Sequence, residues 1–197
     1  CWHLMSQEQA ERVASHQVPE ILSSDLSSLW LSVLQWGCRD INQLSWLDTP
    51  TTQALNVAKD LLYRLGAVDK QCGLTPRGLR MAQWGIEPRL AAILDYASEQ
   101  SDNHLATAAR LCAILEEPPR GQEINLEWIA QQKNTFWSRR EKQLSQHRKG
   151  VFCPELLGLL LAVGFPDRIA KNRDNQGRFR LANGQGAMMD DTQAISG

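Results

Sequence analysis

The side chains of this sequence that could do chemistry are cations, and they gather in its last third. One group lies on or just after an expected helix and comprises Arg139, Arg140, Lys142, Arg148 and Lys149. The other lies around an expected β segment and comprises Arg168, Lys171, Arg173, Arg178 and Arg180. Such cations could neutralise the phosphates of a nucleic-acid strand, an attraction that ignores base sequence and weakens with salt. The plainer alternative is a solvated charged face.

The distribution of charge, not its total, favours a nucleic-acid partner. The chain has 197 residues and a net charge of −1, which by itself indicates no partner. Residues 1–132 hold 10 Lys and Arg against 16 Asp and Glu, whereas residues 133–180 hold 11 against 4. Because the positive charge is confined to the later segment, single-stranded nucleic acid is a candidate ligand there.

The residues offer no catalytic constellation and no metal site. There is no G-x-x-x-x-G-K-[ST] loop to hold a nucleotide, and the four histidines are far apart in sequence. The five cysteines are never at C-x-x-C spacing, which favours reduced thiols and a cytoplasmic location over zinc or disulfides. No apolar run is long enough to span a membrane. We therefore expect no catalytic residue, cofactor or metal within this chain, and no membrane association.

The seven tryptophans could stack on bases, but packing explains most of them better. Four fall on or beside apolar stripes and are expected in the core: Trp30, Trp36, Trp84 and Trp128. Trp137 lies beside Arg139 and Arg140, yet packing is again the favoured interpretation.

The elements that must position these groups are mainly helical. The stretch from Pro50 to Leu94 predicts a helix, a short hairpin, a helix, a turn and a third helix. Pro50 suits the first helical position and Gly66 a left-handed C-terminal cap. The pairs 67–68 and 73–74 flank a polar turn and predict a two-stranded wing. Thr75 before Pro76 predicts an N-cap, and Pro88 opens the third helix.

The rest of the chain predicts further helices and one late hairpin. Asp25 is expected to cap a helix over Leu26–Trp36, and Asp102 or Asn103 one that ends at Leu115. Other expected helices are Gln7–Ala14, Glu123–Gln132, Thr135–His147 and Pro154–Val163, the last of which could continue through Lys171. Strands are expected at Cys1–Leu4 and, around Asn183-Gly184, at Arg178–Leu181 and Ala187–Met189. The tail from Asp190 to Gly197 is expected to be disordered.

Several of these segments also resemble a known family. LLYRLGAVD, GLTPRGLRMA and EPRLAAIL occur in that order, followed by ILEEPPR and FPDRIAKNRDNQGRFRLANGQGA. Together they are similar to the helicase-associated region of DEAH-box ATP-dependent helicases, and most closely to the bacterial HrpB-type branch. The resemblance extends over nearly the whole chain, which begins at Cys1 and is therefore expected to be a fragment.

The resemblance implies a fold and a division into parts. Residues 1–19 would be the end of the second RecA-like motor lobe and a linker, and residues 20–86 a winged helix. Residues 87–150 would be a ratchet-like helical bundle. Residues 151–197 would be a terminal helix and the start of an oligonucleotide-binding-type β domain. Gly66, Thr75, Gly78, Pro88 and Arg89 fall within the shared motifs and are expected to have structural roles at the junction.

The resemblance also implies a function. This chain would be the accessory part of an ATP-dependent helicase, lining the channel for a single strand, with RNA favoured, and coupling motor motion to translocation. ATP and Mg²⁺ would bind in the RecA-like lobes of the parent, and the chain alone should be inactive.

Two alternatives stay open: a stand-alone winged-helix module and a protein-docking module, neither with enzymatic activity. The helix at the recognition position has only Lys59 and Arg64 against Asp60, a weak basic face for duplex DNA. Three other arginines are expected to form ion pairs or packing contacts at the junction: Arg77, Arg80 and Arg89.

Overall fold

The computed structural model describes residues 6, 8, 18–120, 125–173 and 177–188. The strand expected at Cys1–Leu4, the helix expected at Gln7–Ala14 and the tail expected at 190–197 lie outside the described residues, Ser6 and Glu8 excepted.

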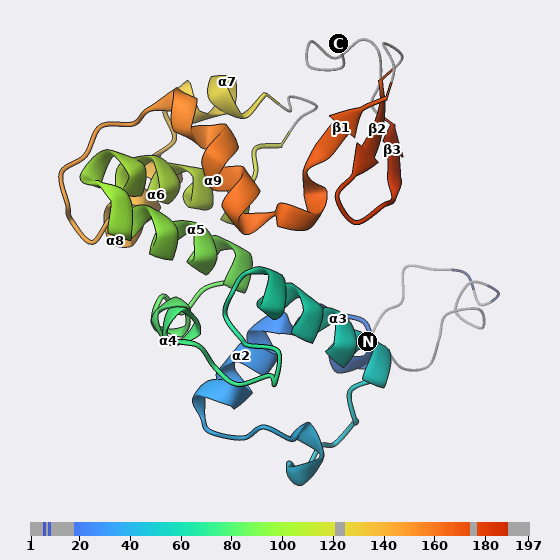
Figure 1. Ribbon diagram of the computed structural model, residues 1–197. Helices are drawn as coiled ribbons and strands as arrows, with labels where there is room; N and C mark the ends of the chain where they lie inside the picture. The colour runs from blue at the N-terminus through green and yellow to red at the C-terminus, as the bar shows by residue number, and fades with distance from the viewer. Residues whose placement is uncertain (1–5, 7, 9–17, 121–124, 174–176, 189–197) are drawn as a thin grey trace.

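The described part of the chain is mainly helical with one small antiparallel sheet, as expected (Figure 1). The α-helices are α2 Ser27–Gln35, α3 Thr52–Arg64, α4 Pro76–Gln83, α5 Pro88–Gln100, α6 Asp102–Glu116, α7 Leu126–Gln131, α8 Thr135–Leu144 and α9 Leu157–Gly164. Short 3₁₀ turns are η1 Glu20–Leu22, η2 Ile41–Gln43, η3 Pro154–Leu156 and η4 Pro166–Arg168. The strands are β1 Ala170–Asn172, β2 Arg178–Leu181 and β3 Gly186–Met188.

Two hydrophobic cores meet at α5. The first is built on α2, α3 and α4 around the buried side chains of Trp30, Leu62 and Met81. The second is built mainly on α5, α6 and α9 and continues toward α7 and α8. Ala91 and Ala92 of α5 belong to the first core, whereas Ile93 and Leu94 belong to the second. Figure 1 shows α5 lying between the two halves, so one helix fixes their relative position.

Two predicted helix starts are wrong by one or two residues, because a hydroxyl is the actual cap. α3 begins after Thr51, not at Pro50, since the Thr51 side chain accepts a hydrogen bond from the Ala54 amide. α6 begins after Ser101, whose hydroxyl accepts from the His104 amide, so neither Asp102 nor Asn103 is the cap. Asp25 does accept from the Ser27 amide, but α2 starts at Ser27.

The expected two-stranded wing is reduced to a single bridge between Val68 and Leu74. The amides of Asp69 and Thr75 donate across the turn to the carbonyls of Gly73 and Ala67, but the Ala67 amide donates to the Leu62 carbonyl at the end of α3, so the pairing does not extend further. The Asp69 carboxylate also closes the loop, because it accepts from the amides of Gln71 and Gly73.

The junction motif is held by one threonine and two glycines. The Thr75 hydroxyl donates to the Gly66 carbonyl and accepts from the Gly78 amide, which confirms Thr75 as the cap of α4. Gly66 has a φ of 73°, a left-handed conformation that favours glycine. At Gly78 a Cβ atom would overlap the Ala67 carbonyl oxygen and stand 2.8 Å from Leu74 Cδ1, so the backbones of α4 and the loop approach closely there.

The later elements differ from the prediction in their ends. α8 stops at Leu144, before the expected His147, because Gln146 and His147 have φ values of 52° and 61°. The helix expected to continue through Lys171 ends as η4, and β1 follows it. The hairpin around Gly184 is confirmed. β2 has the predicted bounds, and β3 is shifted by one residue from the predicted strand.

The tryptophan predictions are partly right. Trp30 is 1% exposed and Trp137 3% exposed, and Trp84 packs against the cores, as expected. Trp36 and Trp128 are 85% and 53% exposed, so their assignment to the core is wrong. Trp36 is the C-cap of α2, one residue beyond Gln35, with which the helix ends.

The close approach at Gly78 predicts a large loss of stability on adding one methyl group. Gly78→Ala should lower the free energy of unfolding by about 3 kcal/mol, because backbone must move to admit it. Gly158→Ala is the matched control: a Cβ there meets nothing within 4 Å, and alanine should stabilise α9 by up to about 1 kcal/mol. Urea unfolding followed by circular dichroism measures both. Equal stability of the two variants would contradict the prediction.

Candidate nucleic-acid interface

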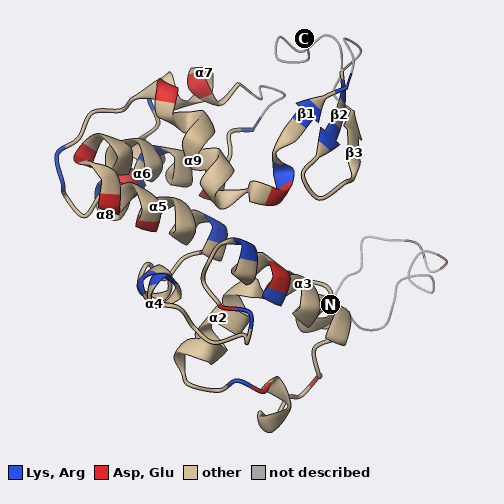
Figure 2. Ribbon diagram, viewed as in Figure 1, with Lys and Arg blue, Asp and Glu red and all other residues tan. Residues whose placement is uncertain are grey.

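The strand register gathers four of the predicted cations on one face of the sheet. Lys171 of β1 lies directly opposite Arg180 of β2. Just past β1, the Arg173 amide donates to the Arg178 carbonyl, so these two residues are opposed as well. Because side chains alternate along a strand, Lys171, Arg173, Arg178 and Arg180 share one face, which we call the cationic face. Figure 2 shows these basic segments on neighbouring strands.

The two faces of the sheet have different chemistry. The four side chains of the cationic face are exposed, whereas Phe179 and Leu181, which alternate with the arginines, are half-buried on the other face. Like charges set directly opposite each other across two strands repel. Among the described residues no ion pair involves the side chain of Lys171 or Arg180. An anionic ligand would relieve this repulsion.

Arg168 lies outside the sheet, at the end of η4. Its guanidinium carbon is 5.2 Å from the centroid of the Phe165 ring, and that of Arg89 is 5.0 Å from the same centroid. Both are within the range of a cation–π interaction. Arg168 is exposed and sits at the point where the chain leaves α9 for β1.

Arg89 fixes the base of the sheet to the helices. From the first turn of α5, its buried guanidinium donates to both carboxylate oxygens of Asp167, at 2.6 and 3.0 Å, and to the Gly164 carbonyl at 3.1 Å. The hydrogen bonds from Arg89 hold the pKa of Asp167 below its usual value. The expected ion-pairing role of Arg89 is thus confirmed, although its partner lies far along the chain, in the basic segment.

Arg77 and Arg80 are ion-paired, as expected. Arg80 of α4 donates to both oxygens of Asp95 on α5, at 2.7 and 3.1 Å, and Arg77 is 3.5 Å from the same carboxylate. Asp95 is 2% exposed and sequence reasoning missed it. Its signal was a carboxylate that follows Ala91 and Ala92 at helical spacing, on the apolar surface of α5.

The α8 cations are not brought to the cationic face. Figure 2 draws α8 and the sheet on opposite sides of the helices. Arg140 is engaged with Glu116 of α6 through two contacts of 2.7 and 2.8 Å, which raise the pKa of Arg140. Arg148 pairs with Asp102. Arg139 and Lys142 are exposed, three residues apart on one helix face, without an ion pair to the described part of the chain.

Arg110 is a second organising residue that sequence reasoning missed. Its buried side chain donates to the carbonyls of Ala130 and Gln132, contacts Glu141 at 3.5 Å and lies over the Trp137 ring. It thereby joins α6 to the end of α7 and to α8. Burial raises the pKa of Glu141 despite this arginine. An arginine within the apolar stripe of α6 was the available signal.

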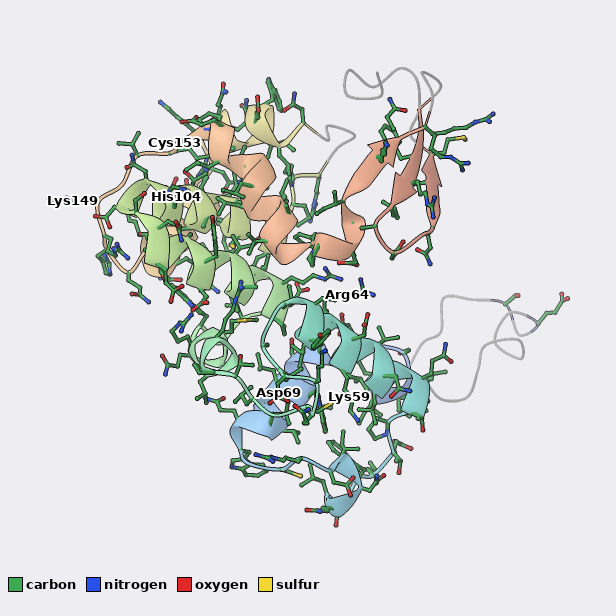
Figure 3. All side chains as sticks on the ribbon, viewed as in Figure 1. Lys59, Arg64, Asp69, His104, Lys149 and Cys153 are labelled. Carbon is green, nitrogen blue, oxygen red and sulfur yellow. The ribbon has the colours of Figure 1, made fainter. Side chains whose placement is uncertain are left out.

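Other classes of site find little support. Over residues 18–120, 125–173 and 177–188, no three His, Cys, Asp or Glu side chains are grouped so as to hold a metal ion. None of the described helices is long and apolar enough to cross a membrane. Burial raises the pKa of the Cys112 thiol, which makes it unreactive. In Figure 3, His104 and Cys153 lie on the helical half, away from the sheet.

Comparison with known proteins shows that the chain is similar to part of the DEAH-type helicases, although no family model matches it. The probable ATP-dependent RNA helicase DHX35 of Homo sapiens is 28% identical over 124 residues, which are 60% of this chain and 18% of the relative. The ATP-dependent RNA helicase HrpB of Escherichia coli is 46% identical over 98% of this chain and 24% of its own length.

Two solved structures show the same similarity to HrpB. A crystal structure of the E. coli DExH-box NTPase HrpB matches with a TM-score of 0.86, and a crystal structure of the Escherichia coli DEAH/RHA helicase HrpB matches with a TM-score of 0.87. Each match covers 98% of this chain at 46% identity. The chain is therefore a homologue of HrpB-type DEAH-box helicases, as its motifs indicated. It spans about a quarter of the length of these relatives.

The Arg89–Asp167 pair predicts a loss of stability that depends on pH. At neutral pH, Asp167→Asn should lower the free energy of unfolding by about 2 kcal/mol, since it leaves a buried guanidinium without its counter-charge. Because the folded-state pKa of Asp167 is lowered, this stabilisation is complete above the ordinary pKa near 4. It is lost as the pH falls through the lowered value, so wild type and variant should converge in acid.

Urea unfolding at pH 7 and at pH 3 measures this difference. The control is Asp60→Asn, which removes the exposed pair with Arg64 on α3 and should leave the free energy of unfolding nearly unchanged. A difference between wild type and Asp167→Asn that is equal at the two pH values would refute the assignment.

Proposed function

We propose that this chain is the accessory part of an ATP-dependent RNA helicase and that its cationic face holds the phosphates of a single strand. The observation that carries the proposal is the register of Lys171 against Arg180, which sets like charges opposite each other on an exposed sheet. In the absence of a ligand this arrangement is unfavourable. With a polyanion on it, the same four side chains contribute favourable, salt-dependent contacts.

The relatives support the choice of ligand. HrpB and DHX35 are named as ATP-dependent RNA helicases, and the similarity to HrpB extends through the residues of the cationic face. We propose the same class of substrate for this chain, with RNA favoured over DNA. Arg168, at the edge of the sheet, would extend the contact, and Arg139 and Lys142 of α8 would form a separate one.

This proposal gives a role to each predicted part of the chain. The winged helix over residues 20–86 would dock on the RecA-like motor lobes of the same chain, and its exposed Trp36 and Leu47 are candidates for that contact. The ratchet-like bundle over residues 87–150 and the oligonucleotide-binding-type segment that follows would form one wall of the strand's channel. Movements of the lobes would then reach the cationic face through α5 and the Arg89 pair.

The nucleotide chemistry would belong to the motor lobes of the parent, with ATP and Mg²⁺ bound there. This chain has no phosphate-binding loop. We therefore expect the 197-residue chain to bind a strand without hydrolysing ATP. Release of inorganic phosphate, measured with and without single-stranded RNA, should equal that of a protein-free control, and RNA-stimulated release would contradict the expectation.

The proposal predicts that two cations of the sheet carry salt-sensitive binding. Fluorescence anisotropy with single-stranded RNA of about 12–16 nucleotides should give tighter binding at low salt. Lys171→Gln combined with Arg180→Gln should weaken it and make the slope of log K against log salt shallower by about 1.4, since each phosphate contact contributes about 0.7.

The matched control is Arg39→Gln combined with Lys70→Gln, which removes the same charge from exposed positions of the first half. It should change affinity and slope little. If both double variants weaken binding equally, the effect is one of net charge and the cationic face is not the site. If the wild type does not bind at low salt, the proposal fails.

A further inference from the structure

A hollow lined mainly by apolar side chains lies between α6, α9 and the segment that leads into β1. Its volume is about 450 Å³, within the range of roughly 300–1,000 Å³ usual for small-molecule sites. Leu115 of α6 and Gly158, Leu161 and Ala162 of α9 line it, together with Phe165 and Ile169 beyond α9. One charged residue, Arg168, stands among these lining residues.

We propose that this hollow is a subsite for one nucleobase of the bound single strand. The inference rests on the proposed function and adds that the chain contacts bases as well as phosphates. A nucleobase is flat, largely apolar on its faces and attached to an anionic backbone, so it needs an apolar hollow with cations at the rim.

Two of the lining residues, Phe165 and Arg168, provide an aromatic and a cationic group for such a base. Arg168 already lies over the Phe165 ring, with 5.2 Å between guanidinium carbon and ring centroid. A guanidinium plane and an aromatic ring are both surfaces on which bases stack. Arg168 is exposed, so the stacked pair can be approached from solvent.

The position along the chain joins the hollow to the cationic face. Ile169 belongs to the wall of the hollow, and Lys171 is two residues further along the same extended segment. At about 3.3 Å per residue, the wall and the first cation are roughly 6–7 Å apart. A nucleotide whose phosphate is held by Lys171 therefore has its base within reach of the hollow.

Gly158 keeps the hollow open. It lies in the first turn of α9 without a positive φ, and a Cβ atom placed there would meet nothing within 4 Å. Neither backbone conformation nor close packing requires glycine at this position, and glycine costs a helix about 1 kcal/mol relative to alanine. A larger side chain at this position would enter the hollow.

An apolar side chain from another protein segment is the competing occupant. Arg168 favours the nucleotide, because positive charge continues from it along the chain to Lys171 of β1 and, across the strands, to Arg180 of β2. The competing occupant makes a different prediction: filling the hollow would then leave RNA binding unchanged.

The test compares two labelled 12-nucleotide strands by fluorescence anisotropy, one bearing bases and one with an abasic ribose-phosphate backbone. Gly158→Leu should fill the hollow, with Gly158→Ala as the control that leaves most of it open. Ala162→Leu, one turn along α9 on the same wall, is a second filling variant should the first fail to fold. Circular dichroism establishes that each variant is folded.

The expected result is that the wild type binds the base-bearing strand more tightly than the abasic one. Gly158→Leu should weaken binding of the base-bearing strand about tenfold, the order of one lost stacking contact, and leave abasic binding within twofold. Gly158→Ala should behave as wild type.

The other outcomes overturn the inference in distinguishable ways. Equal, salt-sensitive wild-type binding of both strands, or filled variants that bind like wild type, would remove the base subsite and leave the proposed function standing. Filled variants that weaken both strands equally would also count against the subsite, since the loss would then be one of phosphate contacts. Failure of the wild type to bind either strand at low salt would remove both proposals.

Discussion

The arrangement of the second half depends on one partly buried ion pair. Arg89 at the start of α5 reaches across to Asp167 and to the Gly164 carbonyl, some 75 residues later in the sequence. Without this contact the segment from α9 to β1 would be attached mainly by apolar packing, which resists sliding poorly because it has no directional preference. The bidentate geometry fixes both position and orientation. The direction of the cationic face is therefore set by a residue outside the sheet.

Much of the fold could be predicted from local chemistry, and the exceptions have identifiable physical causes. The Thr75 cap, the Gly66 turn and the late hairpin depend on residues within a few positions of each other, so sequence order was sufficient. The wing is limited to one bridge because the Ala67 amide is already taken by the end of α3, a competition that no propensity describes. The assignment of Trp36 to the core was wrong because α2 ends at Gln35, one residue before it.

For the candidate site as well, sequence alone was sufficient for local features and insufficient for long-range contacts. Sequence alone found the ten late cations, but it could not separate those that are already satisfied from those that remain available. That separation depends on long-range partners: Glu116 for Arg140 and Asp102 for Arg148. The pairing of Lys171 with Arg180 was likewise invisible, since β1 was expected to be helical. Asp95 and Arg110 were both missed for the same reason. A charged residue on an apolar stripe indicates that it has a buried partner, but it does not identify that partner.

The shared helix α5 has a mechanical consequence. Over the same turns it contributes Ala91 and Ala92 to one core and Leu90, Ile93, Leu94 and Ala97 to the other, and it is about 20 Å long for its 13 residues. Because both cores pack on the same turns of this one helix, neither core can shift without moving α5. Arg80 of α4 is paired with Asp95 of α5, and Arg89 in the first turn of α5 donates to the Gly164 carbonyl at the end of α9. A displacement of the first half would therefore be passed through α5 to α9, from which the chain leads into β1.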